Sequence, residues 1–330
     1  MRIFKKILKV FLVVIIVLIV CGYLYLKYIF FVPAQNQLTI ENSKTYIPFK
    51  WESDVRNNEI NPYAAMLLPI NINGCPKTFY MQFDLGASSS MFYKNKLDAI
   101  NQKFKNISIE SKSGKDILTN YTFYINGLKV TAKKINVHQY DDSGIDWADT
   151  TTNEIIGTIG SDFIENKVVI IDYPNTKILL TDRIPDSLRA KTEFIKFEFV
   201  NRKIFIPTTI GSAKTDIFFD TGSSTYELLT TKSNWTELAK KDATVYKNEG
   251  NSWGKKEIFY TTAANQSLKF GNVSFPVKEV TYSDGTTSMQ KLFMPIFLKI
   301  IGVGGLTGNK LFVTKKIIFD TKNLDFGVTD

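Results

Sequence analysis

The 330-residue chain contains an internal repeat, which limits the possible folds more than any other feature of the sequence. Two similar motifs, QFDLGASS and FFDTGSS, place Asp84 and Asp220 136 residues apart. Further matched segments follow at offsets that only grow, up to 148 residues between Gly160 of IIGTIGSDF and Gly308 of VGGLTGNKLF. Growing offsets are what loop insertions between shared strands produce. A unit of about 140 residues that occurs twice predicts a duplicated domain rather than a solenoid.

Both copies have the residue pattern of β-strands. Short alternating runs of Ile, Val, Phe, Tyr and Thr are separated by Gly, Asn, Asp and Pro, so we predict a mainly β fold with two lobes. The first lobe is expected at residues 46–180, the connection at 181–193 and the second lobe at 194–330. Apart from the N-terminus, the best helix candidate is SNWTELAKK, which starts at Ser233 and ends at Lys241.

The N-terminus has the pattern of a membrane anchor. Residues 10–32 form an apolar segment whose uncharged part is about 17 residues long, at the short end for a spanning helix. Basic residues in the tail at 1–9 predict a cytoplasmic N-terminus, with the lobes in the periplasm or at the cell surface. The polar residues 33–45 are predicted to be a tether. A cleaved signal peptide and a lipoprotein signal ending at Cys21 are the alternatives.

The inventory of reactive side chains leaves carboxylates as the candidate catalytic groups. His138 is the only histidine, and Cys21 and Cys75 are the only cysteines. Zinc sites use three or four nitrogen or sulfur ligands, so a transition-metal centre is not expected. His138 lies in an alternating run and is interpreted as a surface or packing residue. The net charge of +9 is scattered along the chain, partly in the anchor, so nucleic acid is not an expected partner.

The two aspartate motifs resemble those of the aspartic protease superfamily. One Asp-Thr-Gly tripeptide is common by chance, but two copies in a duplicated β frame, each followed by an apolar-apolar-Gly element, are specific. The resemblance covers about residues 46–330. It implies an acid-protease-like pair of β-barrels in one chain. Because the units are shorter than those of typical pepsin-like enzymes, the chain looks like a fused pair of retropepsin-like units.

The resemblance implies that Asp84 and Asp220 are the catalytic pair. Two carboxylates about 3 Å apart can hold a water molecule and share one proton, since like charges at that distance cannot both ionise. One carboxylate then acts as a base towards the water and the other as an acid towards the carbonyl group. Gly86 and Gly222 let the backbone turn tightly behind each carboxylate.

The first motif departs from the family pattern at two positions. The family's threonine is present as Thr221 but replaced by Leu85, and Ser223 has no hydroxyl counterpart at Ala87. In the family, the two threonine hydroxyls bond across the lobe interface, which a leucine cannot do. We therefore predict that Asp220 is the better stabilised anion and Asp84 the readier proton carrier.

Two hairpins are candidates for flaps over a substrate. Their predicted tips contain Ser111 and Gly114 in the first copy, and Trp253 and Gly254 in the second. The alternative for both is an ordinary exposed hairpin.

A cleft between two lobes would take an extended peptide as an added strand. The predicted function is therefore that of an aspartic endopeptidase, a hydrolase acting on a peptide or protein substrate without a cofactor. The first alternative, favoured by Leu85, is a catalytically weak or inactive module that binds a peptide or protein at the membrane. In the second alternative, Asp84 and Asp220 are turn residues of unrelated strands.

Overall fold

The chain forms two compact units, Met1–Gln35 and Asn36–Asp330. The computed structural model describes residues 6, 9, 11–17, 20–22, 35–41, 44–56, 59–105, 107–112, 114–140, 143–252, 255–285 and 302–330. In the first unit, residues 11–17 and 20–22 are helical, and much of the predicted anchor lies outside the described residues. Among the residues that are described, no helix has the length and apolar character needed to cross a membrane.

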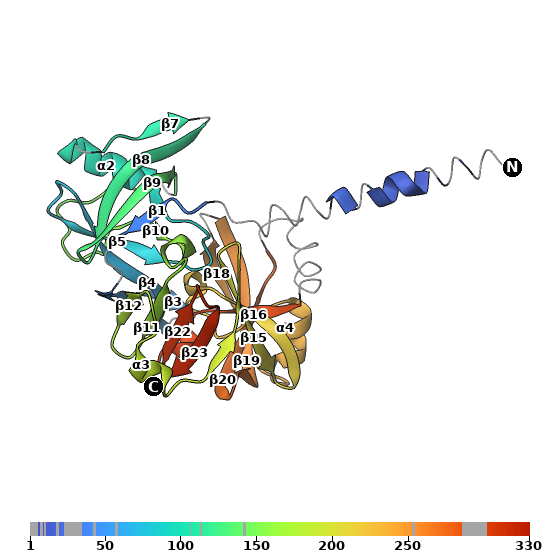
Figure 1. Cartoon of the computed structure of the whole chain (residues 1–330). Helices are drawn as coiled ribbons and strands as arrows, with labels where there is room; N and C mark the ends of the chain where they lie inside the picture. Colours follow the sequence, from blue (N-terminus) through green and yellow to red (C-terminus); the bar gives the residue numbers. More distant parts are fainter. Residues whose placement is uncertain are drawn as a thin grey trace. The chain divides into compact units, whose positions relative to one another are not determined.

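The second unit contains three β-sheets in its described part (Figure 1). A nine-stranded sheet builds the first lobe from β1 (Leu38–Ile40), β3 (Lys50–Arg56), β4 (Glu59–Ile72), β5 (Thr78–Phe83), β6 (Met91–Tyr93), β7 (Glu110–Lys112), β8 (Lys115–Ile125), β9 (Leu128–His138) and β10 (Ile155–Ile159). An eight-stranded sheet builds the second lobe from β14 (Glu198–Val200), β15 (Lys203–Ile210), β16 (Ala213–Phe219), β17 (Leu229–Thr230), β18 (Val245–Ser252), β19 (Lys255–Phe270), β20 (Val273–Ser283) and β21 (Val303–Thr307).

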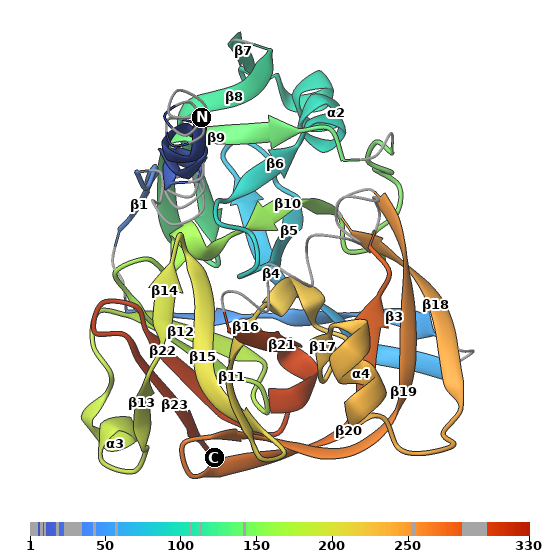
Figure 2. The same cartoon turned by 90° about the vertical axis from the view of Figure 1, so that its right-hand side faces the viewer.

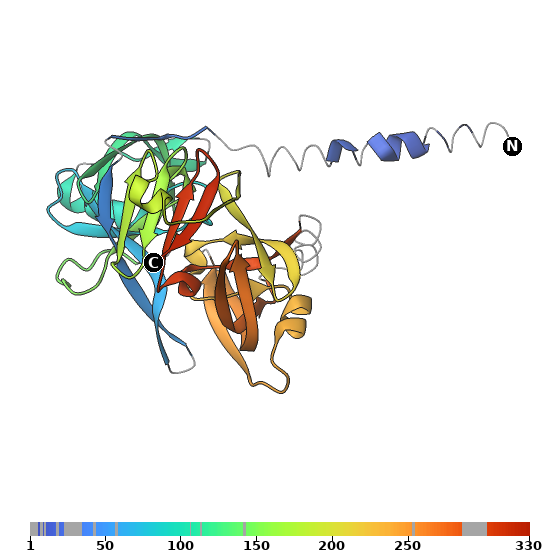
Figure 3. The ribbon, with the colours of Figure 1, turned by 60° about the horizontal axis from the view of Figure 1, so that its bottom comes forward.

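A six-stranded sheet joins the two lobes. Its strands are β2 (Thr45–Pro48), β11 (Val168–Asp172), β12 (Lys177–Thr181), β13 (Phe194–Lys196), β22 (Lys316–Asp320) and β23 (Asp325–Thr329). The central strands β11 and β22 come from different halves of the chain and pair antiparallel, with Ile170 opposite Ile318. Both are short apolar runs that are almost wholly buried, as expected for central strands. The sheet lies alongside both lobes (Figure 1 and Figure 3) and fixes one lobe against the other.

The two lobes repeat the same strand pairings, as the internal repeat predicts. In the first lobe, β5 pairs in parallel with β10, β10 pairs antiparallel with β6, and β6 pairs in parallel with β9. In the second lobe, β16, β21, β17 and β20 make the same three pairings in the same order. Each sheet then closes on itself, because β8 pairs with both β9 and β4 in one lobe and β19 pairs with both β20 and β15 in the other. The fold is therefore a mainly β pair of closed barrels (Figure 2).

The helices in the described part of the second unit are short. They comprise the α-helices α2 (Lys94–Phe104), α3 (Asp186–Arg189) and α4 (Lys232–Leu238), and the 3-10 helices η1 (Ser161–Phe163), η2 (Thr221–Ser223) and η3 (Asn309–Phe312). Helix α2 is not predicted from the sequence, although its buried residues Leu97 and Ile100 have helical spacing. Helix α4 begins one residue before the predicted start and ends three residues before the predicted end. Thr231 caps it by accepting a hydrogen bond from the Asn234 amide.

The segment predicted as a polar tether is partly folded. Residues 38–40 form β1, which pairs antiparallel with β9 in the first lobe. Leu38 and Ile40 alternate with a polar residue and pack against the hydrophobic core, which explains why this part of the segment forms a strand. The Asn36 side chain also donates a hydrogen bond to the main-chain oxygen of Asp162.

Candidate active site

Each motif aspartate follows a strand whose last residue is anchored in the core. Phe83 ends β5 and Phe219 ends β16, and both side chains are fully buried. Phe83 packs edge-on against Phe163 of η1, and Phe219 packs against Phe312 of η3. Burying a side chain of this size stabilises the fold by about 1.5–3 kcal/mol, which holds the end of each strand in place. The two aspartates therefore start their loops from equivalent, rigid positions.

The structure brings Asp84 and Asp220 into hydrogen-bond contact. The Gly86 amide lies between them and approaches Asp84 Oδ1 at 2.9 Å and Asp220 Oδ1 at 3.0 Å. One main-chain donor is thus shared by two carboxyl groups that belong to different lobes. This arrangement suits a pair of carboxyl groups that share one proton.

The two motif glycines are required by the close approach of the loops. A Cβ atom on Gly86 would lie 2.5 Å from Asp220 Cγ, and a Cβ atom on Gly222 would lie 2.6 Å from Asp84 Cγ. Each glycine therefore faces the aspartate of the other lobe, and no side chain fits at either position.

The two carboxyl groups have different surroundings. Asp84 is buried and, among the described residues, accepts hydrogen bonds from the main-chain amides of Gly86 and Ala87, besides its contact with Asp220. Asp220 is half-buried and accepts from the Gly222 amide at 2.7 Å and the Ser223 hydroxyl at 2.9 Å. Burial and the charge of Asp220 raise the pKa of Asp84 well above its usual range, despite the two amide donors.

A single threonine hydroxyl connects the two motif loops across the lobe interface. Thr221 Oγ1 donates to the Phe83 oxygen at 2.7 Å and accepts from the Leu85 amide at 2.8 Å. The reciprocal position is occupied by Leu85, whose side chain is fully buried in the hydrophobic core. The cross-lobe support is thus a hydroxyl on one side and apolar packing on the other.

A second set of side chains binds main-chain oxygens of the motif loops. These residues were not predicted from the sequence. Ser161 Oγ donates to the Leu85 oxygen at 2.6 Å, and Asn309 Nδ2 donates to the Thr221 oxygen at 3.1 Å. The buried Tyr173 hydroxyl donates to Asn309 Oδ1 at 2.7 Å. Ser161 and Asn309 directly follow the matched glycines of the repeat, so their equivalent positions were a usable signal.

The first loop has a further buried anchor at its end. The amide and hydroxyl of Ser90 donate to the Asp162 carboxylate at 2.8 and 2.7 Å, and Ser90 Oγ accepts from the Gly160 amide at 3.0 Å. Burial raises the pKa of Asp162, while the bonds from Ser90 and the charge of Arg202 act in the opposite direction.

The structure describes two of the four flap candidates, Ser111 and Gly114. Ser111 lies on β7, and Gly114 forms the following turn with a φ of 72°. This hairpin lies beside α2 at the outer end of the first lobe (Figure 1 and Figure 2), where Asp116 pairs with Lys94 of α2 at 3.0 Å. Trp253 and Gly254 lie outside the described residues. The flap role of these residues stays a prediction.

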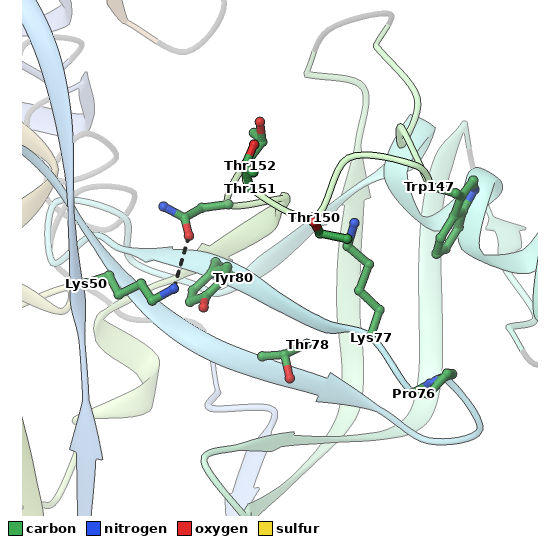
Figure 4. A pocket seen from close by; sticks show the side chains of 10 residues that line it. Lys50, Pro76, Lys77, Thr78, Tyr80, Trp147, Thr150, Thr151 and Thr152 are labelled. Carbon is green, nitrogen blue, oxygen red and sulfur yellow. Dashed lines mark hydrogen bonds between the residues drawn. The ribbon is translucent and has the colours of Figure 1, made fainter.

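A pocket of about 440 Å³ opens elsewhere on the first lobe (Figure 4). It is lined by Lys50, Pro76, Lys77, Thr78, Tyr80, Trp147, Thr150, Thr151, Thr152 and Asn153, so neither motif aspartate contributes to it. In the part of the chain that the structure describes, no group of three or more His, Cys, Asp or Glu side chains is arranged to hold a metal ion.

Comparison with known proteins found a similarity of structure but none of sequence. No protein-family model matches the chain, and no curated protein matches its sequence. Among solved structures, the chain is similar to an aspartic proteinase from Irpex lacteus, with 13% sequence identity and a TM-score of 0.48. That match covers 86% of this chain and 96% of the other.

Proposed function

We propose that the chain is an aspartic endopeptidase that hydrolyses peptide bonds with a water molecule held between Asp84 and Asp220. The observation that supports this best is the contact between two carboxyl groups from different lobes, which share the Gly86 amide as a donor. The raised pKa of Asp84 supports an unequal pair, in which one member keeps a proton.

The unequal surroundings suggest the role of each aspartate. Asp220 removes a proton from the water, whose oxygen attacks the carbonyl carbon, while Asp84 gives its proton to the carbonyl oxygen. The tetrahedral intermediate then collapses as Asp220 passes its proton to the leaving nitrogen and Asp84 recovers a proton from a hydroxyl group. The C–N bond breaks and both carboxyl groups return to their starting states. Ser223 and the Gly222 amide orient Asp220 as the base.

The proposed substrate is an extended peptide or an extended segment of a protein. The aspartates lie where the loops of two barrels meet, and a chain crossing that junction would reach both carboxyl groups. Main-chain hydrogen bonds to neighbouring strands would provide affinity, and side-chain pockets would provide selectivity.

We also propose that residues 10–32 anchor the protein as a single-pass membrane segment, with the lobes in the periplasm or at the cell surface. Support comes from the apolar sequence of this segment and from the helical residues 11–17 and 20–22. Deleting residues 1–35 should release the protein from alkali-washed membranes. Recovery of the full-length chain in the soluble fraction would contradict the proposal.

Peptide cleavage tests the proposed activity. The full-length protein in detergent should cut members of an extended-peptide library between about pH 4 and 6, as followed by mass spectrometry. In water enriched in ¹⁸O, the new carboxyl group should gain one labelled oxygen. The Asp84→Asn and Asp220→Asn variants should be inactive, and cleavage that persists in either would contradict the assignment.

Leu85 favours a second candidate, a module that binds peptides without cutting them. A buried leucine replaces one of the two cross-lobe hydroxyls, which could leave the pair too loosely held for catalysis. Saturable binding of library peptides without products at any pH would favour this candidate over the endopeptidase.

A further inference from the structure

We infer that Arg202 is a positioning residue that clamps the Asp84 loop from the opposite lobe and adds to the support that Thr221 gives the same loop. Arg202 belongs to the second lobe, whereas the groups that it binds belong to the first. Its expected effect on catalysis rests on the proposed function, but its effect on the loop does not.

The backbone at Arg202 is unfavourable for an arginine. Strands β14 and β15 are joined by a two-residue turn, Asn201–Arg202, with Val200 paired to Lys203. The φ angles of Asn201 and Arg202 are 48° and 62°. Turns of this kind favour Gly and Asn, because the Cβ atom of other residues crowds the backbone. The turn alone does not require an arginine at its second position. We therefore attribute the presence of arginine there to the contacts of its side chain.

The arginine side chain makes charged and polar contacts across the lobe interface. It is only 3% exposed, and its Nε and NH2 groups donate to Glu165 Oε2 at 3.2 and 3.1 Å. The remaining terminal nitrogen donates to the Ser88 oxygen at 3.3 Å. In return, the Ser88 hydroxyl donates to the Asn201 oxygen at 3.1 Å. A buried arginine with several defined acceptors holds its neighbours in a definite geometry.

These contacts act on the loop that carries Asp84. Ser88 lies four residues after Asp84, and Glu165 lies three residues after Asp162, which binds Ser90 at the end of the same loop. Arg202 therefore ties the middle of the loop to the segment that supports its end.

In the part of the chain that the structure describes, the loop after Asp220 is not bound by an arginine from the other lobe. Alignment on the matched prolines of the repeat places Ala64 opposite Arg202, and an alanine side chain offers no hydrogen-bond donor. Ser224, the counterpart of Ser88, instead accepts from the Lys310 amide at 3.0 Å and from Asn309 at 2.9 Å. Both donors belong to its own lobe, so the clamp serves the Asp84 loop alone.

Amide hydrogen exchange of the full-length protein tests the inference. The Arg202→Lys and Glu165→Gln variants should each speed exchange at residues 84–90 at least tenfold, with less than a twofold change at residues 220–226. Lysine keeps the charge but cannot reach both acceptors at once. Arg183→Lys, at an exposed arginine, is the matched control and should change neither loop. Asn201→Gly relaxes the turn without removing the clamp and should also leave the loop protected.

Catalysis supplies a second readout. With a cleaved peptide, Arg202→Lys should lower kcat at least tenfold while KM changes less than threefold, and the double variant with Glu165→Gln should be no worse. Equal loosening of both loops, or unchanged exchange at residues 84–90, would overturn the inference. Because exchange needs no substrate, an inactive wild-type protein would refute the proposed function while leaving the test of the clamp intact.

Discussion

In the loop that follows Asp220, a main-chain amide and a hydroxyl group donate to the aspartate from within the same loop. The loop that follows Asp84 offers its aspartate main-chain amides alone, and its next residue is a buried leucine. It relies on the other lobe, through the Thr221 hydroxyl and the Arg202 side chain. Two copies of one motif can thus keep the same hydrogen bonds from main-chain amides while one copy lacks the hydroxyl that orients its aspartate. The result is a buried carboxyl group with main-chain donors beside a half-buried one that also has a hydroxyl donor.

The largest effect should come from filling the space between the loops. Gly86→Ala would place a methyl group 2.5 Å from Asp220 Cγ, and Gly222→Ala would press on Asp84 in the same way. Both variants should lose about 10³-fold in kcat/KM, because the two carboxyl groups are forced apart. Gly144→Ala, where no atom lies within 4 Å of the new methyl group, is the control. Activity retained in Gly86→Ala would show that the contact between the loops is not needed.

The next effect should follow from removing the cross-lobe hydroxyl. Thr221→Val leaves the Phe83 oxygen and the Leu85 amide without their side-chain partner in a buried place. We expect the free energy of unfolding, measured in urea, to fall by about 2–4 kcal/mol. Thr150→Val, at an exposed threonine, should change it by less than about 0.5 kcal/mol. A small loss in Thr221→Val would mean that apolar packing alone holds the loops together.

A smaller effect should come from making the two aspartates more alike. Ser223→Ala removes the hydroxyl that donates to Asp220 Oδ2 at 2.9 Å, which leaves this loop with main-chain donors, like the first. We expect kcat/KM to fall about tenfold, since hydrogen bonds to charged groups contribute about 1.5–3 kcal/mol. Ser187→Ala, at an exposed serine of α3, is the control and should leave kcat/KM unchanged. An unchanged kcat/KM would contradict the role of the hydroxyl.

The smallest effect concerns proton binding. Because burial raises the pKa of Asp84, the folded chain holds this proton at pH values where the unfolded chain has lost it. Its contribution to stability is full below the ordinary pKa of aspartate and is lost as the pH rises towards the raised pKa. Asp84→Asn should flatten this part of the pH–stability curve measured in urea. The same slope in wild type and Asp84→Asn would contradict a raised pKa.

Comparing the two copies in the sequence finds what the copies share. Asp84, Asp220 and their glycines stand at matched positions, so the repeat identifies them. The presence of two barrels with the same strand order follows from the same repeat. The departure at Leu85 is also visible in the sequence. Because leucine has no hydroxyl, only the Thr221 side chain can make the hydrogen bonds across the lobe interface that the family pattern predicts. In the structure it bonds the Phe83 oxygen and the Leu85 amide of the other lobe.

Residues that act in one copy only are invisible to that comparison. Arg202 is opposite an alanine, and its partners Ser88 and Glu165 lie more than 30 residues away in the sequence. Tyr173 reaches the second motif only because the six-stranded sheet brings the halves together. Helix α2 and strand β1 are short, and packing rather than local preference decides them.

The central claim is that Asp84 and Asp220 form an unequal pair in which Asp84 keeps the proton. Carbon-13 NMR of the full-length protein, labelled at the aspartate carboxyl groups, measures this directly when Asp84→Asn is used to assign the signal. Our account predicts that the Asp84 carboxyl remains protonated at pH values where a carboxyl group with the ordinary pKa of aspartate has ionised. Ionisation of Asp84 together with the exposed aspartates would contradict it.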